Sequence, residues 1–259
     1  MRLDRFLSGQ TALSRRELGE LIRRGAVTVN GTVIRKPETS VQPGTDAVML
    51  QGKLVSYSEF HWFLLHKPEG VITAARDPKQ KTVLDLMDPA DRLPKLAPVG
   101  RLDKDTSGML LITDDGVTAH KMISPKHHVA KYYLARLRDP FRQEYVSAFR
   151  DGILLREGEN DEPCQPAVCC PIATDLAVLE LHEGKYHQVR RMFAAVGNHV
   201  ENLLRVQIGM LRLPPDLPEE RYLQLFNKDV ESALKNSDIS DVCAFCAEYY
   251  SSYWIKERK

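Results

Sequence analysis

Apolar residues near the N-terminus recur with helical spacing. Residues 3–7 place three apolar side chains at positions i, i+3 and i+4, which predicts a short amphipathic helix. Ser14-Arg15-Arg16-Glu17 has the capping-box pattern, and residues 18–22 repeat the helical spacing, so a second helix is expected there. The chain therefore opens with two short helices.

A β-hairpin is expected directly after the second helix. Gly25 is placed to end that helix, and Val27 and Val29 then alternate with polar neighbours. Asn30-Gly31 is a strong two-residue turn signal, and the return strand passes through Val33. The pattern predicts a helix–helix–hairpin unit.

Short strands and intervening helices follow a polar stretch at residues 51–59. The apolar residues 62–65 form the first of these strands and run into a proline–glycine turn at 67–70. Further strands are expected at Met109–Thr113, Tyr132–Leu137, Ala177–Leu181 and Tyr222–Phe226, with helices at Phe141–Phe149 and Val189–Val196. More strands than helices, joined by irregular loops, indicate an α+β fold on a mixed, largely antiparallel sheet.

The pattern divides the chain into three expected parts. Residues 1–58 form a small domain, residues 59–230 form the α+β domain, and residues 231–259 form a C-terminal helical extension. Within the extension a helix is expected over 238–256, with an apolar face that packs against this same chain. That face consists of Val242, Cys246, Tyr249 and Tyr253.

Composition narrows the class of protein. The chain has 259 residues, is 43% hydrophobic and contains 36 Lys and Arg against 35 Asp and Glu. It has no apolar stretch of about 18 residues and no apolar run after its first basic residues, so we expect a cytoplasmic protein without a membrane segment. Five cysteines in a chain of this length are expected to be reduced. Cys243-x-x-Cys246 lacks a second ligand pair, which favours core thiols over zinc.

Positive charge is concentrated near the N-terminus. Residues 1–36 contain eight basic and three acidic side chains. Arg15-Arg16 begins the second predicted helix and Arg23-Arg24 ends it. Charge alone fits either a solvated helix face or contacts with nucleic-acid phosphates.

Two segments present side chains suited to chemistry. Residues 100–108 form a charged loop between two glycines, which can present the carboxylate of Asp103 but alone resembles an ordinary turn. Residues 183–197 form a turn and a helix, on which Arg190 borders the buried stripe and Arg191 points away from it. Arg190 then either has an internal anionic partner or covers apolar surface with its stem.

These segments together resemble a known family. Gly100-Arg101-Leu102-Asp103, Lys131-x-Tyr133 and Gly184-x-x-x-Gln-Val-Arg-Arg-Met192 occur in the order found in RsuA-type pseudouridine synthases. The N-terminal unit resembles the αL-type RNA-binding module of a ribosomal small-subunit protein. The resemblance spans nearly all of residues 1–226, and it implies an αL-type RNA-binding domain followed by a pseudouridine synthase catalytic domain.

The resemblance also implies roles for individual residues. Asp103 is the expected catalytic carboxylate, Tyr133 the ring that stacks on a flipped-out base, and Arg190 a partner that holds the pKa of the Asp103 carboxyl below its usual range. Attack on the sugar, attack on the base and removal of a ribose proton all remain open for Asp103. The reaction requires no cofactor, and no metal is expected. RNA contacts are expected from Arg15, Arg16, Arg23, Arg24, Arg101, Lys131, Arg191 and Arg205.

The expected substrate is 16S ribosomal RNA, bound by a monomer. Residues 186–188 and 193–200 resemble the small-subunit enzyme more than its large-subunit relatives. The alternatives are 23S ribosomal RNA as substrate and a catalytically silent ribosome-assembly factor, which would tolerate loss of the site residues. One departure is Leu203-Leu204-Arg205, where the family has Leu-His-Arg. A metal-dependent nuclease or deaminase would need clustered ligands that the sequence lacks.

Overall fold

The computed structural model describes residues 1–157 and 160–254, which form two compact units. The first comprises Met1–His61 and Leu84–Leu96, and the second comprises Trp62–Val83 and the described chain from Ala97 onward. The C-terminal extension thus belongs to the second unit. None of the helices in the described ranges is long and apolar enough to cross a membrane.

The first unit combines two helices with a small antiparallel sheet. The helices are α1 (Leu3–Gln10) and α2 (Arg15–Arg23), and the sheet has the strand order β2-β1-β3-β4. Its strands are β1 (Val27–Val29), β2 (Thr32–Ile34), β3 (Val48–Leu50) and β4 (Lys53–Leu54). The predicted capping box is confirmed, because the Ser14 N–H donates to Glu17 Oε2 at 2.8 Å and the Glu17 N–H donates to Ser14 Oγ at 3.3 Å. The predicted hairpin turns at Asn30 and Gly31.

The second unit contains a large mixed sheet with the strand order β11-β12-β8-β13-β7-β5-β15. The strands are β5 (Trp62–Lys67), β6 (Ala97–Pro98), β7 (Ser107–Thr113), β8 (Lys131–Leu137), β11 (Val168–Ala173), β12 (Leu176–Leu181), β13 (Val200–Ile208), β14 (Leu211–Arg212) and β15 (Tyr222–Leu225). Among these described strands, β13 and β7 pair in parallel and the others are antiparallel. A separate antiparallel pair joins β9 (Leu154–Glu157) to β10 (Asn160–Pro163).

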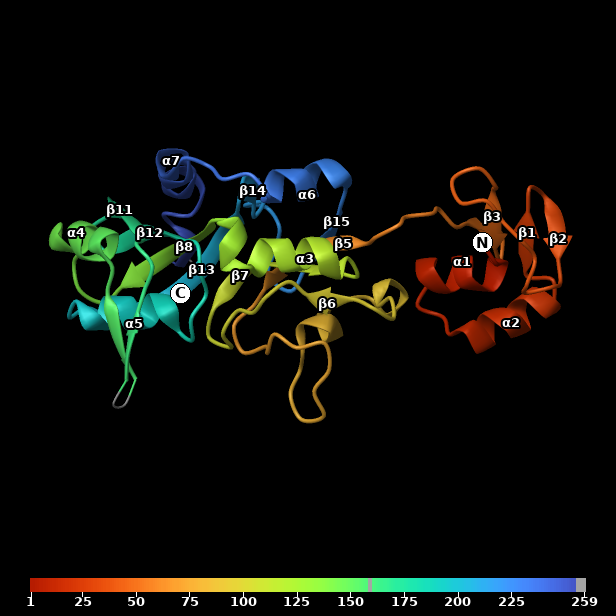
Figure 1. Cartoon of the computed structure of the whole chain (residues 1–259), viewed down its shortest axis with the longest axis horizontal. Coiled ribbons are helices and arrows are strands. Elements are labelled where there is room, and N and C mark those ends of the chain that lie inside the picture. The colour runs from red at the N-terminus through yellow and green to blue at the C-terminus, as the bar shows by residue number, and fades with distance from the viewer. Residues whose placement is uncertain (158–159, 255–259) are drawn as a thin grey trace. The chain divides into compact units, whose positions relative to one another are not determined.

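Helices cover both faces of this sheet. They are α3 (Gly116–Ile123), α4 (Glu144–Asp151), α5 (Gln188–Ala195), α6 (Asn227–Ala233) and α7 (Ile239–Tyr249), with a short 3-10 turn at Pro125–His127. Two further 3-10 turns, at Val83–Leu86 and Pro89–Asp91, fall almost entirely in the segment Leu84–Leu96 of the first unit. In Figure 1, α7 (dark blue, top) and α5 (cyan, bottom) lie on opposite sides of β8, β12 and β13. Successive side chains of one strand therefore meet different helices.

The predicted α+β class is correct, and each strand and helix predicted between residues 59 and 230 begins and ends within three residues of an observed one. The sequence analysis did not predict β13, although this strand lies between β8 and β7 at the centre of the sheet. Polar residues interrupt its apolar pattern, because Arg205 and Gln207 are buried there rather than facing solvent. Helix α3 was also not predicted.

Gly108 allows β13 to approach β7. Its φ of +108° lies in a region that L side chains rarely adopt, and it is paired in register with Arg205. A Cβ atom at this position would lie 2.4 Å from the Arg205 carbonyl oxygen and 2.6 Å from its nitrogen. The glycine that ends the charged loop therefore fixes where β13 and Arg205 can lie.

The C-terminal helix packs on this chain as predicted, but its extent and buried face differ. Val242 and Cys246 are fully buried against β11 and β12, while Tyr249 is 49% exposed. The helix ends at Tyr249 instead of residue 256, and Tyr250 turns inward and donates its hydroxyl to the Leu213 carbonyl at 3.0 Å. The predicted helix end at residues 255–256 lies outside the described residues.

Two neighbouring tyrosines test this packing. Tyr250→Ala is expected to lower the free energy of unfolding by about 3–5 kcal/mol, because it removes a fully buried ring and leaves a cavity. The matched control Tyr249→Ala removes an exposed ring, so it should change the free energy of unfolding by less than about 1 kcal/mol. Urea unfolding measures both values. Equal losses would contradict the docking of Tyr250.

Candidate active site

A cleft of about 700 Å³ opens on the second unit. Its walls come from the loop before β7, from one face of β8 and β13, and from the turn that precedes α5. Five of the predicted site residues line it, namely Arg101, Asp103, Lys131, Tyr133 and Arg205. Arg190 and Arg191 lie outside the lining, although their neighbours Gln188 and Val189 contribute to it.

The loop that carries Asp103 is held from three sides. Thr73 exchanges hydrogen bonds with the backbone of Leu102, at 2.7 Å and 3.1 Å. The Lys67 ammonium donates to the Thr106 carbonyl at 2.8 Å, and the Gly70 N–H donates to the Lys104 carbonyl at 2.7 Å. The carboxylate is therefore presented on a fixed backbone, as catalytic positioning requires.

Asp103 is partly buried in the cleft. Burial raises the pKa of its carboxyl group above the ordinary value, and the negative charge of Asp105 raises it further. The positive charges of His187, Arg190 and Lys67 act in the opposite direction. The expectation of a lowered pKa is thus wrong, because the loss of hydration outweighs the cationic neighbours.

Arg190 forms its ion pair with Asp105 and not with Asp103. Its Nε lies 3.2 Å from Asp105 Oδ2, and its Nη2 donates to the Asp105 carbonyl at 2.8 Å. Its Nη1 donates to the Val200 carbonyl, also at 2.8 Å. The predicted anionic partner exists, but it stands two residues farther along the loop. Arg190 thereby joins α5 to both the loop that carries Asp103 and the start of β13.

Lys67 and His187 are additional site residues that the sequence analysis did not single out. Lys67 is fully buried, and burial lowers its pKa to about 8. The Nε2 of His187 lies 3.7 Å from Asp103 Oδ1, and its ring stacks on Tyr186 with centroids 4.0 Å apart. A signal for Lys67 was its place at the end of an apolar strand, directly before the proline–glycine turn.

Strand alternation separates the residues of the Lys-x-Tyr motif. Tyr133 lines the cleft and is 9% exposed, whereas Tyr132 faces the opposite side and donates its hydroxyl to the Ser237 carbonyl at 2.7 Å. Lys131 lies two residues before Tyr133 and lines the cleft with it. Arg205 enters the same space from β13, with Cζ 6.0 Å from the centre of the Tyr133 ring.

The remaining two cations near the cleft differ in their surroundings. Arg101 lines the cleft with an exposed side chain. Arg191 is largely covered, since its Nη1 lies 3.3 Å from Glu162 Oε2 and donates to the Tyr186 carbonyl at 3.1 Å. Arg101 is therefore the freer of the two to meet a phosphate.

Asp103, Asp105 and His187 form a cluster of residue types that bind metal ions. Single ligand atoms of Asp103, Asp105 and His187 lie within 4.8 Å of one another. Arg190 is paired with Asp105, and the charges of Lys67 and Arg190 both act on Asp103. This positive surrounding opposes a bound metal ion.

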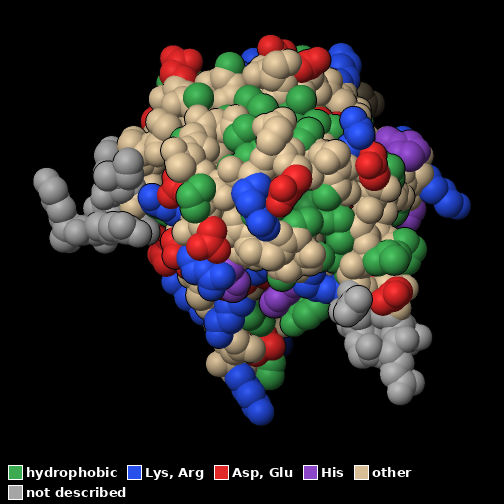
Figure 2. Space-filling view, turned by 90° about the vertical axis from the view of Figure 1, so that its left-hand side faces the viewer, with side chains coloured by type: hydrophobic (Ala, Val, Ile, Leu, Met, Phe, Trp, Pro, Cys, Tyr) green, Lys and Arg blue, Asp and Glu red, His purple; other side chains and the backbone are tan. Residues whose placement is uncertain are grey.

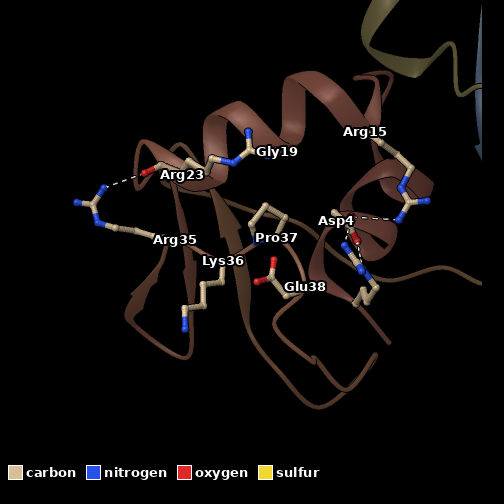
Figure 3. Close-up of a pocket in the computed structure, with 9 residues that line it drawn as sticks. Asp4, Arg15, Gly19, Arg23, Arg35, Lys36, Pro37 and Glu38 are labelled. Atoms are coloured by element: carbon tan, nitrogen blue, oxygen red, sulfur yellow. Dashed lines mark hydrogen bonds and ion pairs between the residues drawn. The ribbon is translucent and has the colours of Figure 1, made fainter.

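A second hollow, of about 350 Å³, lies on the first unit (Figure 3). It is lined by Arg2, Asp4, Arg15, Gly19, Arg23, Arg35, Lys36, Pro37 and Glu38. Asp4 forms ion pairs with two of the cations, since its Oδ2 lies 3.0 Å from Arg2 and 3.1 Å from Arg15. The hydrogen bond from Arg2 lowers the pKa of the Asp4 carboxyl group. Of the four predicted arginines, Arg15 and Arg23 line the hollow; Arg16 and Arg24 are exposed outside it.

Charge is also unevenly spread over the second unit. Figure 2 views the molecule from the end at which α4 lies in Figure 1. Acidic, basic and apolar side chains are mixed in the upper part of this face, while Lys, Arg and His side chains gather in the lower part. The net charge of +1 therefore conceals local positive surface.

The pH dependence of activity should report the surroundings of Asp103. Asp105→Asn removes the charge that raises the pKa of Asp103, so the acid limb of the pH–rate profile is expected to move to lower pH. Asp115→Asn, which changes a carboxylate that caps α3 outside the cleft, should leave the limb in place. Single-turnover rates between pH 4 and 8 measure both. An unshifted limb in Asp105→Asn would contradict the assignment.

Comparisons with known proteins agree with this architecture. The family model for RNA pseudouridylate synthase matches residues 61–195, and the S4 domain model matches residues 1–46. The chain belongs to the RNA pseudouridylate synthase family, and it is a pseudouridine synthase with an N-terminal S4 domain.

Individual relatives cover most of the chain. Ribosomal small subunit pseudouridine synthase A of Escherichia coli K12 is 38% identical over 90% of this chain and 100% of its own length. Its counterpart from Vibrio cholerae is 40% identical over 91% of this chain. A protein from Bacillus subtilis described as an uncharacterized RNA pseudouridine synthase is 36% identical over 89% of this chain and 97% of its own. A solved pseudouridylate synthase structure has a TM-score of 0.63 at 36% identity, covering 90% of this chain and 99% of its own.

Proposed function

We propose that this enzyme isomerises a uridine of 16S ribosomal RNA to pseudouridine, as a monomer in the cytoplasm. The observation that carries the choice of substrate is the match to relatives named for the ribosomal small subunit, which are aligned over their whole length at 38–40% identity. The alignment includes the S4 domain as well as the catalytic domain, so it supports a common mode of RNA binding.

Asp103 acts as the catalytic carboxylate. The reaction breaks the bond between ribose C1′ and the base N1, turns the base and joins C1′ to C5. No oxidant and no external energy are needed, because the product is an isomer of the substrate. A base within a stack cannot turn, so it must be flipped into the cleft, where the ring of Tyr133 provides a stacking surface. Arg190 acts as a positioning residue that holds the loop through Asp105.

The S4 domain supplies phosphate contacts through Arg15, Arg16, Arg23 and Arg24, all of which are exposed. On the second unit, Arg101 supplies a further phosphate contact at the cleft, whereas Arg191 is held by Glu162. Phosphates lie along the whole RNA backbone, so these side chains orient the substrate while the cleft selects the base.

Salt dependence tests the S4 contacts. Replacing Arg15, Arg16, Arg23 and Arg24 with alanine should weaken RNA binding and reduce the slope of log K against log salt by about 0.7–0.9 for each lost contact. The control replaces the same four arginines with lysine, which retains the charge and should retain most of the slope. Filter binding over a range of salt concentrations gives the slopes. If the alanine variant keeps the wild-type slope, the four side chains do not contact phosphate.

Pseudouridine mapping tests the substrate. Ribosomal RNA from cells that lack this gene should lose one pseudouridine of 16S RNA, and the wild-type gene should restore it while Asp103→Asn should not. Loss of a 23S modification instead would contradict the proposed substrate but not the class of enzyme.

A further inference from the structure

Two buried cations line the active-site cleft. Lys131 is 8% exposed and Arg205 is 3% exposed, and both line the cleft beside Tyr133. They come from neighbouring antiparallel strands, with Arg205 paired in register with Tyr133. Phosphate contacts normally use exposed side chains, so burial this deep points to a different role.

Neither cation has a carboxylate partner among the residues that the structure describes. The Lys131 ammonium donates to the Val129 carbonyl at 3.2 Å, and the charge that acts on it is that of Arg205, a second cation. Arg205 donates from Nε to the Met109 carbonyl at 2.7 Å, while its Nη2 is buried without a hydrogen-bond partner. Burial lowers the pKa of Lys131 to about 8, so the ammonium form still prevails near neutral pH.

Besides Asp103, the acidic side chain that lines the cleft is Glu183, and it is already engaged. Glu183 accepts hydrogen bonds from the Gln165 N–H at 2.9 Å and from Gln188 Nε2 at 2.7 Å. Its second oxygen lies 4.0 Å from Lys185. Two buried positive charges without an anion are costly to a fold, which indicates that a ligand supplies negative charge there.

Pseudouridine formation produces that negative charge on the base. If the C1′–N1 bond breaks first, its electron pair stays on N1 and the uracil anion spreads the charge over N1, O2 and O4. If a nucleophile adds to C6 first, the electron pair moves to C5 and O4. In either case C5 later bonds to C1′ and loses its proton, and N1 gains one. Every route thus passes through a pyrimidine with negative oxygens.

From this geometry we infer that Lys131 and Arg205 form an anion subsite that stabilises the negative oxygens of the detached or adducted uracil. The base stacked on Tyr133 is held between Asp103 on the ribose side and these two cations. Groups aimed at developing charge in a water-poor site are among the strongest contributors to catalysis. Lys131 and Arg205 are therefore catalytic residues rather than phosphate anchors.

The inference rests on pseudouridine synthesis and is independent of which ribosomal subunit is modified. The substrate for its test is an RNA fragment that the wild-type enzyme converts, from 16S or 23S RNA. The test variant is Lys131→Met, which keeps the apolar stem and removes the charge. Lys228→Met serves as the control because Lys228 is an exposed lysine on α6.

The single-turnover rate of Lys131→Met should fall by about 100-fold or more, in the range seen when one oxyanion donor is removed. Its Kd for the RNA should change by less than about threefold, since binding energy to phosphates is retained. The control Lys228→Met should have the single-turnover rate and the Kd of the wild type. Far-ultraviolet circular dichroism checks folding, and Lys131→Gln provides a second variant that retains a donor.

A substrate with 5-fluorouridine at the target position separates charge stabilisation from a structural role. Fluorine withdraws electrons and stabilises the uracil anion, so the loss caused by Lys131→Met should be at least about tenfold smaller on this RNA than on the uridine RNA. Nuclease digestion and chromatography measure the consumed nucleoside. Equal fractional losses on the two RNAs, or a loss confined to Kd, would overturn the inference.

Discussion

Asp103→Asn is expected to abolish pseudouridine formation while leaving the fold and RNA affinity close to those of the wild type. The amide has the shape of the carboxylate, and the loop around it is fixed by Thr73, Lys67 and Arg190 through contacts that do not involve the Asp103 side chain. An amide can neither act as a nucleophile nor accept a proton at the pH of the reaction, so the chemical step fails.

The measurement is single-turnover conversion of a target RNA, with Kd determined by filter binding. Asp115→Asn is a suitable control, because this carboxylate caps α3 and accepts from the Thr118 N–H at 3.0 Å outside the cleft. Its conversion rate should remain near that of the wild type. Turnover by Asp103→Asn above about one thousandth of the wild-type rate would refute the role of the carboxylate.

Gly108→Ala is expected to lower the free energy of unfolding by at least about 3 kcal/mol, or to displace β13 and inactivate the enzyme. A φ of +108° costs an alanine roughly 1–3 kcal/mol, and the added carbon must also move a backbone that would lie 2.4 Å away. Backbone atoms within a central sheet cannot rotate aside as a flexible side chain can. The penalty therefore exceeds that of the unusual φ alone.

Gly70→Ala isolates the conformational part of this penalty. Gly70 has a φ of +82°, and a Cβ there would meet nothing within 4 Å. Its substitution should cost only about 1–2 kcal/mol. Urea unfolding of both variants gives the comparison. If Gly108→Ala is as stable as Gly70→Ala, the backbone of Arg205 on β13 does not exclude a Cβ atom at position 108.

Local patterns in the sequence predicted most of the fold. The capping box at Ser14 and the turn at Asn30-Gly31 are decided by residues within four positions of each other, and both are confirmed. Strand alternation places Tyr132 in the core and Tyr133 in the cleft, and Tyr133 is the ring that the resemblance assigned to the site. The order of the motifs then identified the family.

Features that depend on distant residues were predicted less well. The partner of Arg190 could not be chosen between Asp103 and Asp105 from helical periodicity, since both lie on one short loop. The raised pKa of Asp103 depends on burial by segments far apart in the chain. Similarly, the choice between Tyr249 and Tyr250 as the buried ring depends on where α7 ends. The helix ends at Tyr249, and the ring of Tyr250 is the buried one.

The position of β13 limits how early the cleft can form during synthesis of the chain. Arg205 bonds to Met109 across 96 residues of sequence, and β13 stands between the strand that follows the Asp103 loop and the strand that carries Tyr133. Until residues 200–208 have left the ribosome, these two strands have no common neighbour. Contacts so distant in sequence form late and slowly. A nascent chain can therefore complete its small N-terminal sheet while its cleft is still unassembled, which makes insertion of β13 the expected slow step of folding.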